Sequence, residues 1–175
     1  MKKNFILGVM LSISLLFAGC SNKLDDKEQV TISSGKVSDG IEIGKELKEY
    51  TFTDQFDKKH SLSNNTKKVI FVFTKPTGHL VKSYLLQQDK NYLTKRDIDF
   101  IADVSGMPSI IFKMFALPDF KKSNYTVLLI KDKEKSATFR DEKHKDSVMI
   151  ITLDKKIVKD VKFVTNEKDL IKAIN

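Results

Sequence analysis

Short runs of β-branched and aromatic residues recur along the chain and predict strands. Three runs are largely apolar without alternation, which is the pattern of strands buried on both faces of a sheet. They are residues 68–74, 99–104 and 125–130. Residues 148–164 contain two further apolar runs around a polar turn and predict a strand pair. Upstream, aromatic residues alternate with polar ones over residues 50–62, which predicts a hairpin.

Three apolar patterns at helical spacing predict helices. The first extends toward Leu93, and Pro108 is placed to begin the second, which Pro118 ends. Thr165 or Asn166 caps the third. The residues expected to face the core are Leu80, Val81, Tyr84, Leu85 and Leu86 in the first helix, Ile110, Ile111, Met114 and Phe115 in the second, and Leu170, Ile171 and Ile174 in the third.

The order of these elements is hairpin, strand, helix, strand, short helix, three strands and helix. It predicts an α/β fold with a mixed central sheet flanked by helices and preceded by a β-hairpin. Residues 20–42 are polar and rich in Ser, Lys, Asp and Gly, which predicts a flexible tether. We therefore expect a signal peptide at 1–19, a tether at 20–42 and one folded domain at 43–175.

The first twenty residues carry a targeting signal. Two lysines precede an apolar run from Phe5 to Ala18, which is too short to span a bilayer comfortably. The segment Leu16-Phe17-Ala18-Gly19-Cys20 resembles the bacterial lipobox, although Phe17 stands where Leu is usual. The resemblance implies cleavage before Cys20, lipidation of its thiol, and a domain anchored to an extracytoplasmic membrane face. Ser21 favours the outer membrane in an organism that has one. An ordinary secretory signal or an N-terminal anchor with a chance thiol stays the alternative.

Charge and cysteine content exclude several classes of function. The chain has 31 basic and 23 acidic residues, and the part after residue 19 keeps 29 and 23 of them. This basic excess is well mixed, so it indicates a solvated surface with weak attraction for anionic lipid headgroups. No nucleic-acid motif is present. Cys20 is the only cysteine, so its lipidation leaves no thiol for disulfides, redox chemistry or a cysteine metal site. No cofactor is expected.

The phrase from Phe52 to Leu62, followed by Val69-Ile70-Phe71-Val72-Phe73, resembles thioredoxin-like domains that begin with a hairpin. Membrane-tethered thiol oxidoreductases and peroxiredoxins are of this kind. The chain also resembles a group of small bacterial lipoproteins of unassigned function that carry Gly-His after this strand. In thioredoxin-like enzymes the loop after the strand carries Cys-x-x-Cys, and a cis-proline precedes a later strand. Here Lys75 to Val81 holds no cysteine, and Thr126 stands nearest to the proline position.

The residues at the former thiol position become the candidate ligand-binding site. They are Lys75, Thr77, His79, Asp103 and Ser105. A helix N-terminus beside Lys75 and His79 is suited to a small anion, and His79 with Asp103 would form an acid–base pair. The structural alternative is that His79 packs or caps at the helix start and that Asp103 is a turn residue. Metal and catalytic residues are not expected.

Three weaker candidates remain. His60 is expected to be a solvated turn residue, and residues 140–146 a solvated charged loop. Met107, Met114 and the run 110–115 fit either the core or a hydrophobic groove for a partner. The function predicted from all of this is a non-catalytic, membrane-tethered binding or accessory module of the cell envelope with an envelope protein as partner. The alternative is a small-ligand-binding protein or an enzyme that uses His79, Lys75 and Asp103.

Overall fold

The computed structural model describes residues 29–175, and the predicted signal peptide and lipidated Cys20 lie outside that range. The strands are β1 Val30–Ile32, β2 Lys36–Ser38, β3 Ile41–Glu42, β4 Thr51–Asp54, β5 Lys59–Ser61, β6 Lys68–Val72, β7 Ile98–Asp103, β8 Leu128–Ile130, β9 Val148–Asp154 and β10 Ile157–Val164. The helices are α1 Lys75–Leu85, α2 Tyr92–Lys95, α3 Ser109–Ile111, the π-helical turn η1 Phe112–Ala116, α4 Leu117–Lys121, α5 Lys133–Phe139, the 3-10 turn η2 Glu142–His144 and α6 Glu167–Ile174.

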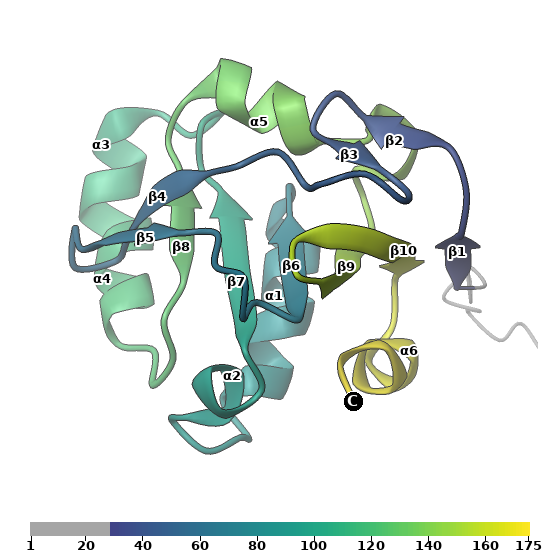
Figure 1. Cartoon of the computed structure of the whole chain (residues 1–175). Coiled ribbons are helices and arrows are strands. Elements are labelled where there is room, and N and C mark those ends of the chain that lie inside the picture. Colours follow the sequence, from purple (N-terminus) through teal and green to yellow (C-terminus); the bar gives the residue numbers. More distant parts are fainter. Residues whose placement is uncertain (1–28) are drawn as a thin grey trace, which may run out of the picture.

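Eight strands form one mixed sheet in the order β1-β10-β9-β6-β7-β8-β4-β5 (Figure 1). The central strands β6, β7 and β8 run parallel, so their carboxyl ends share one edge of the sheet. β9 pairs antiparallel with β6, and the predicted hairpin is β4 with β5. The mixed α/β architecture expected from the apolar pattern is therefore confirmed.

Alternation along the central strands gives the sheet two apolar faces. Ile70 and Val72 point to the face covered by α1 and α6. Val69 and Phe71 point to the other face, where Phe139 of α5 packs. All four strand residues are almost fully buried, and Lys68 at the start of β6 is the one polar residue of the strand. The central strands are thus packed between two hydrophobic cores, one on each face of the sheet.

The folded part begins earlier than the expected boundary at residue 43. β1 pairs with β10 through Val30 and Phe163, and Ile41 is only 1 % exposed in the core. Gly40 lies so close to α5 that an added Cβ would be 3.0 Å from atoms of Thr138. Its amide donates to the Thr138 carbonyl at 2.7 Å. Composition missed this segment because its strands are two or three residues long and bury few side chains.

The first and last helices largely follow the predictions. α1 ends at Leu85 rather than continuing to Leu93, which belongs to the separate α2. α6 begins after Asn166, whose side chain accepts a hydrogen bond from the Asp169 amide, as expected for an N-cap. Val81 and Leu170 are completely buried against the same face of the sheet.

The helix after Pro108 differs from its prediction in two ways. Pro118 does not end it. Because a proline has no N–H and crowds the carbonyl four residues back, the chain widens into η1, and the Leu117 amide donates to the carbonyl of Phe112. The residues predicted to be inner are exposed, while Phe112, Leu117 and Phe120 pack against the core.

Candidate functional site

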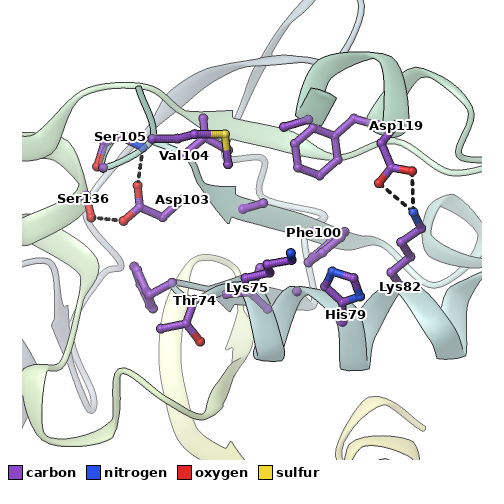
Figure 2. Close-up of a pocket in the computed structure, with 18 of the residues that line it drawn as sticks. Thr74, Lys75, His79, Lys82, Phe100, Asp103, Val104, Ser105, Asp119 and Ser136 are labelled. Carbon is purple, nitrogen blue, oxygen red and sulfur yellow. Dashed lines mark hydrogen bonds and ion pairs between the residues drawn. The ribbon is translucent and has the colours of Figure 1, made fainter. Parts of the chain in front are cut away.

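A cleft of about 870 Å³ opens at the carboxyl ends of β6 and β7 (Figure 2). One wall is the start of α1, a second is the α3–η1–α4 segment, and a third is α5 with the loop after β7. Ligands of α/β sheets tend to bind at such strand ends. The apolar floor consists of Val72, Phe100, Ala102 and Tyr125. Burial raises the pKa of Tyr125 above its ordinary value.

The start of α1 is capped by its own residues. Thr77 is 4 % exposed, and its hydroxyl donates to the Thr74 carbonyl at 2.9 Å and accepts from the Thr74 amide at 3.3 Å. The Thr74 side chain in turn caps the Thr77 amide, and Pro76 has no N–H. Thr77 does not line the cleft. Thr77 therefore caps the helix instead of contacting a ligand, as was predicted for it. Few amide N–H groups at the start of α1 stay free to bind an anion.

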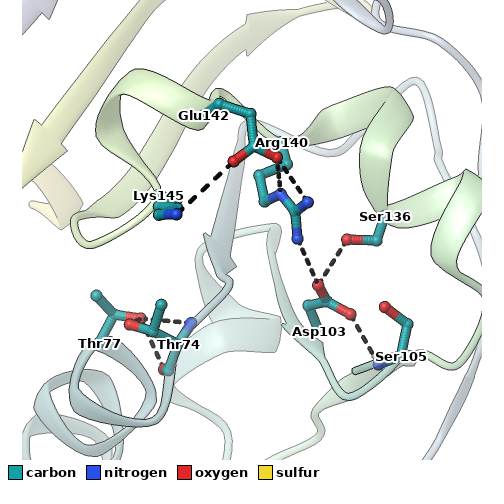
Figure 3. Close-up of polar contacts among 8 residues, drawn as sticks. All are labelled: Thr74, Thr77, Asp103, Ser105, Ser136, Arg140, Glu142 and Lys145. Carbon is teal, nitrogen blue, oxygen red and sulfur yellow. Dashed lines mark hydrogen bonds and ion pairs between the residues drawn. The ribbon is translucent and has the colours of Figure 1, made fainter. Parts of the chain in front are cut away.

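Asp103 is held by groups on two neighbouring elements (Figure 3). The Ser136 hydroxyl donates to its Oδ2 at 2.5 Å, and the Ser105 amide donates to Oδ1 at 2.8 Å. A guanidinium nitrogen of Arg140 lies 3.9 Å away, although Arg140 is bound more tightly by Glu142 at 2.6 Å. The carboxylate is only 5 % exposed. Asp103 thus joins the end of β7 to α5, and Ser105 contributes its backbone.

His79 and Asp103 line the same cleft but do not form the expected pair. His79 is exposed on α1, and Figure 2 shows its ring beside Lys75 and away from Asp103. Within residues 29–175, no hydrogen bond or ion pair joins the two side chains. An oriented acid–base pair is therefore not assembled in this arrangement. Lys75 also lines the cleft and is exposed.

Several cleft residues were missed by the sequence reasoning. Lys133 and Ser136 come from α5, a helix that was not predicted from the sequence, and Arg140 is the C-cap residue of that helix. Lys133 and Ser136 are three residues apart and so lie on one face of α5, and Asp132 is an N-cap whose side chain accepts from the Lys135 amide. These two signals together would have predicted the helix. The ion pair of Lys82 with Asp119 at 2.6 Å closes the far end of the cleft.

The other candidates have structural roles. His60 is not a free turn residue, because its Nε2 lies 2.9 Å from Asp54 in the β4–β5 hairpin. Burial acts to raise the pKa of Asp54, but hydrogen bonds from His60 and from the amides of Phe56 and Lys58 outweigh it and lower the pKa. His144 contacts Asp141 at 2.7 Å and stacks on Phe163. Among residues 29–175, no three His, Cys, Asp or Glu residues gather as metal ligands.

Comparison with known proteins shows the fold only. Neither a protein-family model nor a curated protein sequence matches this chain. The solution structure of a candidate protein disulfide isomerase from Bacteroides thetaiotaomicron is similar with a TM-score of 0.52 and 18 % identity, over 82 % of this chain and 90 % of that one. Peroxidoxin BcpB from Mycobacterium tuberculosis is similar with a TM-score of 0.50 and 15 % identity, over 75 % and 93 %. The chain therefore has a thioredoxin-like fold.

Proposed function

We propose that this protein is a lipoprotein of the bacterial cell envelope, anchored through Cys20, whose thioredoxin-like domain acts as a non-catalytic binding module. One observation carries the proposal. A cleft of about 870 Å³ lies where the thioredoxin-like fold has its redox site, and the chain places Lys75-Pro76-Thr77-Gly78-His79 there without any cysteine.

The lining of the cleft selects a class of ligand. Its floor is apolar, and two of its rim cations, Lys75 and Lys133, have no hydrogen bond or ion pair within the described residues. The other two strong cations of the rim are already paired, Lys82 with Asp119 and Arg140 with Glu142. A molecule with an apolar body and an acidic group matches this arrangement, because the free lysines meet the charge while the floor takes the body.

An enzyme that uses His79 and Asp103 is the weaker alternative. Asp103 already accepts hydrogen bonds from Ser136 and Ser105, and it has no contact with His79. A general base has to lie within hydrogen-bond reach of the proton it takes. The separation of the two side chains therefore favours binding over acid–base chemistry.

Anilinonaphthalene sulfonate, which is aromatic and anionic, is a direct probe of the cleft. We expect the chain from Ser21 to Asn175 to bind it, and the double variant Lys75→Met, Lys133→Met to bind it about three- to tenfold more weakly. Lys168→Met is the matched control, because Lys168 is an exposed lysine on α6 and does not line the cleft. Equal affinity of the double variant and the wild type, measured by fluorescence titration, would contradict this cleft assignment.

The anchor has its own test. Cys20→Ser should abolish incorporation of an alkyne fatty acid and leave an uncut precursor of slower migration. Within residues 29–175, none of the helices has the length and apolar composition to cross a bilayer. Equal labelling of the variant and the wild type would refute the lipobox.

Absence of thiol chemistry is the third test. The chain from Ser21 to Asn175 should not reduce insulin disulfides, because it contains no cysteine. Turbidity that develops with the purified chain, and persists after contaminating oxidoreductases are removed, would show a redox function and contradict the binding-module proposal.

A further inference from the structure

Four large apolar side chains form an exposed stripe along the α3–η1 wall of the cleft. The α3–η1 stripe consists of Ile110, Ile111, Met114 and Phe115, which are 63, 43, 62 and 63 % exposed. They repeat over two successive helical turns at the outer side of the fold, where Figure 1 shows α3 and α4. Single exposed apolar residues are ordinary, but a contiguous group of this size marks an interaction surface.

The charges around the stripe are basic. Lys113, Lys121 and Lys122 are exposed on the same helical segment, and none of them has an ion pair inside the described range. Asp119 is the only carboxylate between residues 105 and 124, and Lys82 neutralises it at 2.6 Å. Apolar residues bordered by unpaired lysines are complementary to the interface of an anionic bilayer.

A short tether keeps the whole domain near a membrane, although β1 and the stripe lie toward opposite edges of the sheet (Figure 1). Nine residues separate Cys20 from Val30, the first residue of β1. Even fully extended, nine residues span only about 30 Å. A lipid at Cys20 therefore holds the domain beside the bilayer, and this step depends on the anchor in the proposed function. Weak surface contacts become effective under such tethering because the local concentration is high.

We propose that the α3–η1 stripe inserts into the interface of an anionic lipid bilayer. Ile110, Ile111, Met114 and Phe115 enter the boundary between headgroups and acyl chains, and Lys121 and Lys122 contact lipid phosphates. Ile111 and Phe115 also line the cleft, so docking places one cleft wall against the membrane. A lipid-anchored binding module would then collect its ligand at the bilayer surface.

A single-site fluorescent label tests the insertion. The processed lipidated chain carries no free thiol, so Met114→Cys takes an environment-sensitive nitrobenzoxadiazole label alone. Ile171→Cys is the control, because Ile171 is also an exposed apolar residue, at 37 %, but lies on α6, away from α3 and α4 (Figure 1). In phosphatidylcholine vesicles that contain phosphatidylglycerol, we expect brominated acyl chains to quench the label at residue 114 and to leave the label at residue 171 unaffected. Equal quenching at the two sites overturns the inference.

Charge reversal tests the basic border. Lys121→Glu with Lys122→Glu should lower the inserted fraction of the Met114→Cys label at least about tenfold on anionic vesicles. Lys58→Glu with Lys59→Glu is the control, since these two lysines are also adjacent and exposed. An unchanged inserted fraction in the first variant overturns the assignment of the lysines to lipid phosphates.

Two further measurements distinguish a bilayer from a second copy of the chain on the stripe, and the stripe proposal from the anchor proposal. Shielding of the label at residue 114 that rises with protein concentration in the absence of vesicles would mean that a second copy, not a bilayer, covers the stripe. Vesicle flotation is scored separately. A chain that floats while residue 114 stays in water refutes only the stripe, whereas a chain that does not float refutes the anchor and the docking that depends on it.

Discussion

The helix α1 and the α3–η1 stripe have the same apolar spacing and opposite surroundings. Leu80, Val81, Tyr84 and Leu85 are spaced as Ile110, Ile111, Met114 and Phe115 are. Val81 and Leu85 are at most 1 % exposed, whereas Ile110 and Phe115 are each 63 % exposed. Helical spacing predicts that a row of side chains shares a face, but it does not say whether that face meets the core.

The difference arises from what each segment packs against. α1 lies on β6 and β9, so its apolar row fills one core of the sheet. The α3–η1–α4 segment already contributes Phe112, Leu117 and Phe120 to that core from its other side. The widened turn before Pro118 changes the register between α3 and α4. A segment with apolar residues on both sides can bury only one of them.

The strongest test of the comparison places a carboxylate at equivalent positions of the two rows. Val81→Asp should cost more than about 4 kcal/mol of unfolding free energy, because the charge would be buried without a partner. Ile111→Asp should change it by no more than about 1 kcal/mol, because Ile111 is 43 % exposed. Thermal melting followed by circular dichroism measures both. Comparable loss in the two variants would show that the stripe is covered in solution.

Truncation to alanine separates the rows more gently. Leu85→Ala should destabilise by about 2–5 kcal/mol, because it leaves a cavity in the core. Phe115→Ala should stay within about 0.5 kcal/mol, as expected for an exposed site. Urea denaturation gives both values. A Phe115→Ala variant as unstable as Leu85→Ala would contradict the exposed placement of the stripe.

The Tyr84 hydroxyl tests whether α1 is held by a polar contact as well as by its apolar row. Tyr84 and Tyr92 share a buried hydrogen bond of 2.7 Å, and Tyr92 also donates to the Asn175 side chain at 3.1 Å. Tyr84→Phe should cost about 0.5–1.5 kcal/mol while the apolar packing is kept. The urea midpoint reports the change. A neutral result would mean that α1 is held by its apolar contacts alone.

The smallest expected effect concerns the ion pair that links the two segments. Lys82 on α1 contacts Asp119 on α4 at 2.6 Å, and their side chains are 30 and 55 % exposed. A double-mutant cycle with Lys82→Met and Asp119→Asn should give a coupling of about 0.2–1 kcal/mol, which falls as salt is added. A larger, salt-independent coupling would indicate that the pair, rather than Phe112 and Phe120, fixes the wall of the cleft.

Much of the fold could be predicted because its signals are local. The continuous apolar run of β6, the alternation of the β4–β5 hairpin and the cap at Asn166 each depend on neighbouring residues. β1, β3 and α5 were missed because their signals are short or charged. Ile41 is buried only because β3 meets α5, which lies about a hundred residues later in the chain.

The sequence predicted which residues lie near the candidate site but not where their side chains point. The pattern placed Lys75, His79, Asp103 and Ser105 at strand ends that share one edge, and all four line the cleft. Thr77 turned inward to cap α1, and Asp103 turned to Ser136 on α5 instead of His79. Side-chain direction depends on the partners that packing brings near, which the sequence order does not specify.

By itself the sequence determined the class of the fold, its central strands and the absence of cysteine after residue 20, because periodicity and composition are properties of the chain. Only the tertiary structure decided that residues 30–42 join the domain, that Asp103 binds Ser136, and that the stripe stays exposed. The physical reason is that burial and pairing are set by contacts between segments far apart in the chain. Two apolar rows with the same spacing can therefore differ in burial, because only one of them packs against the sheet.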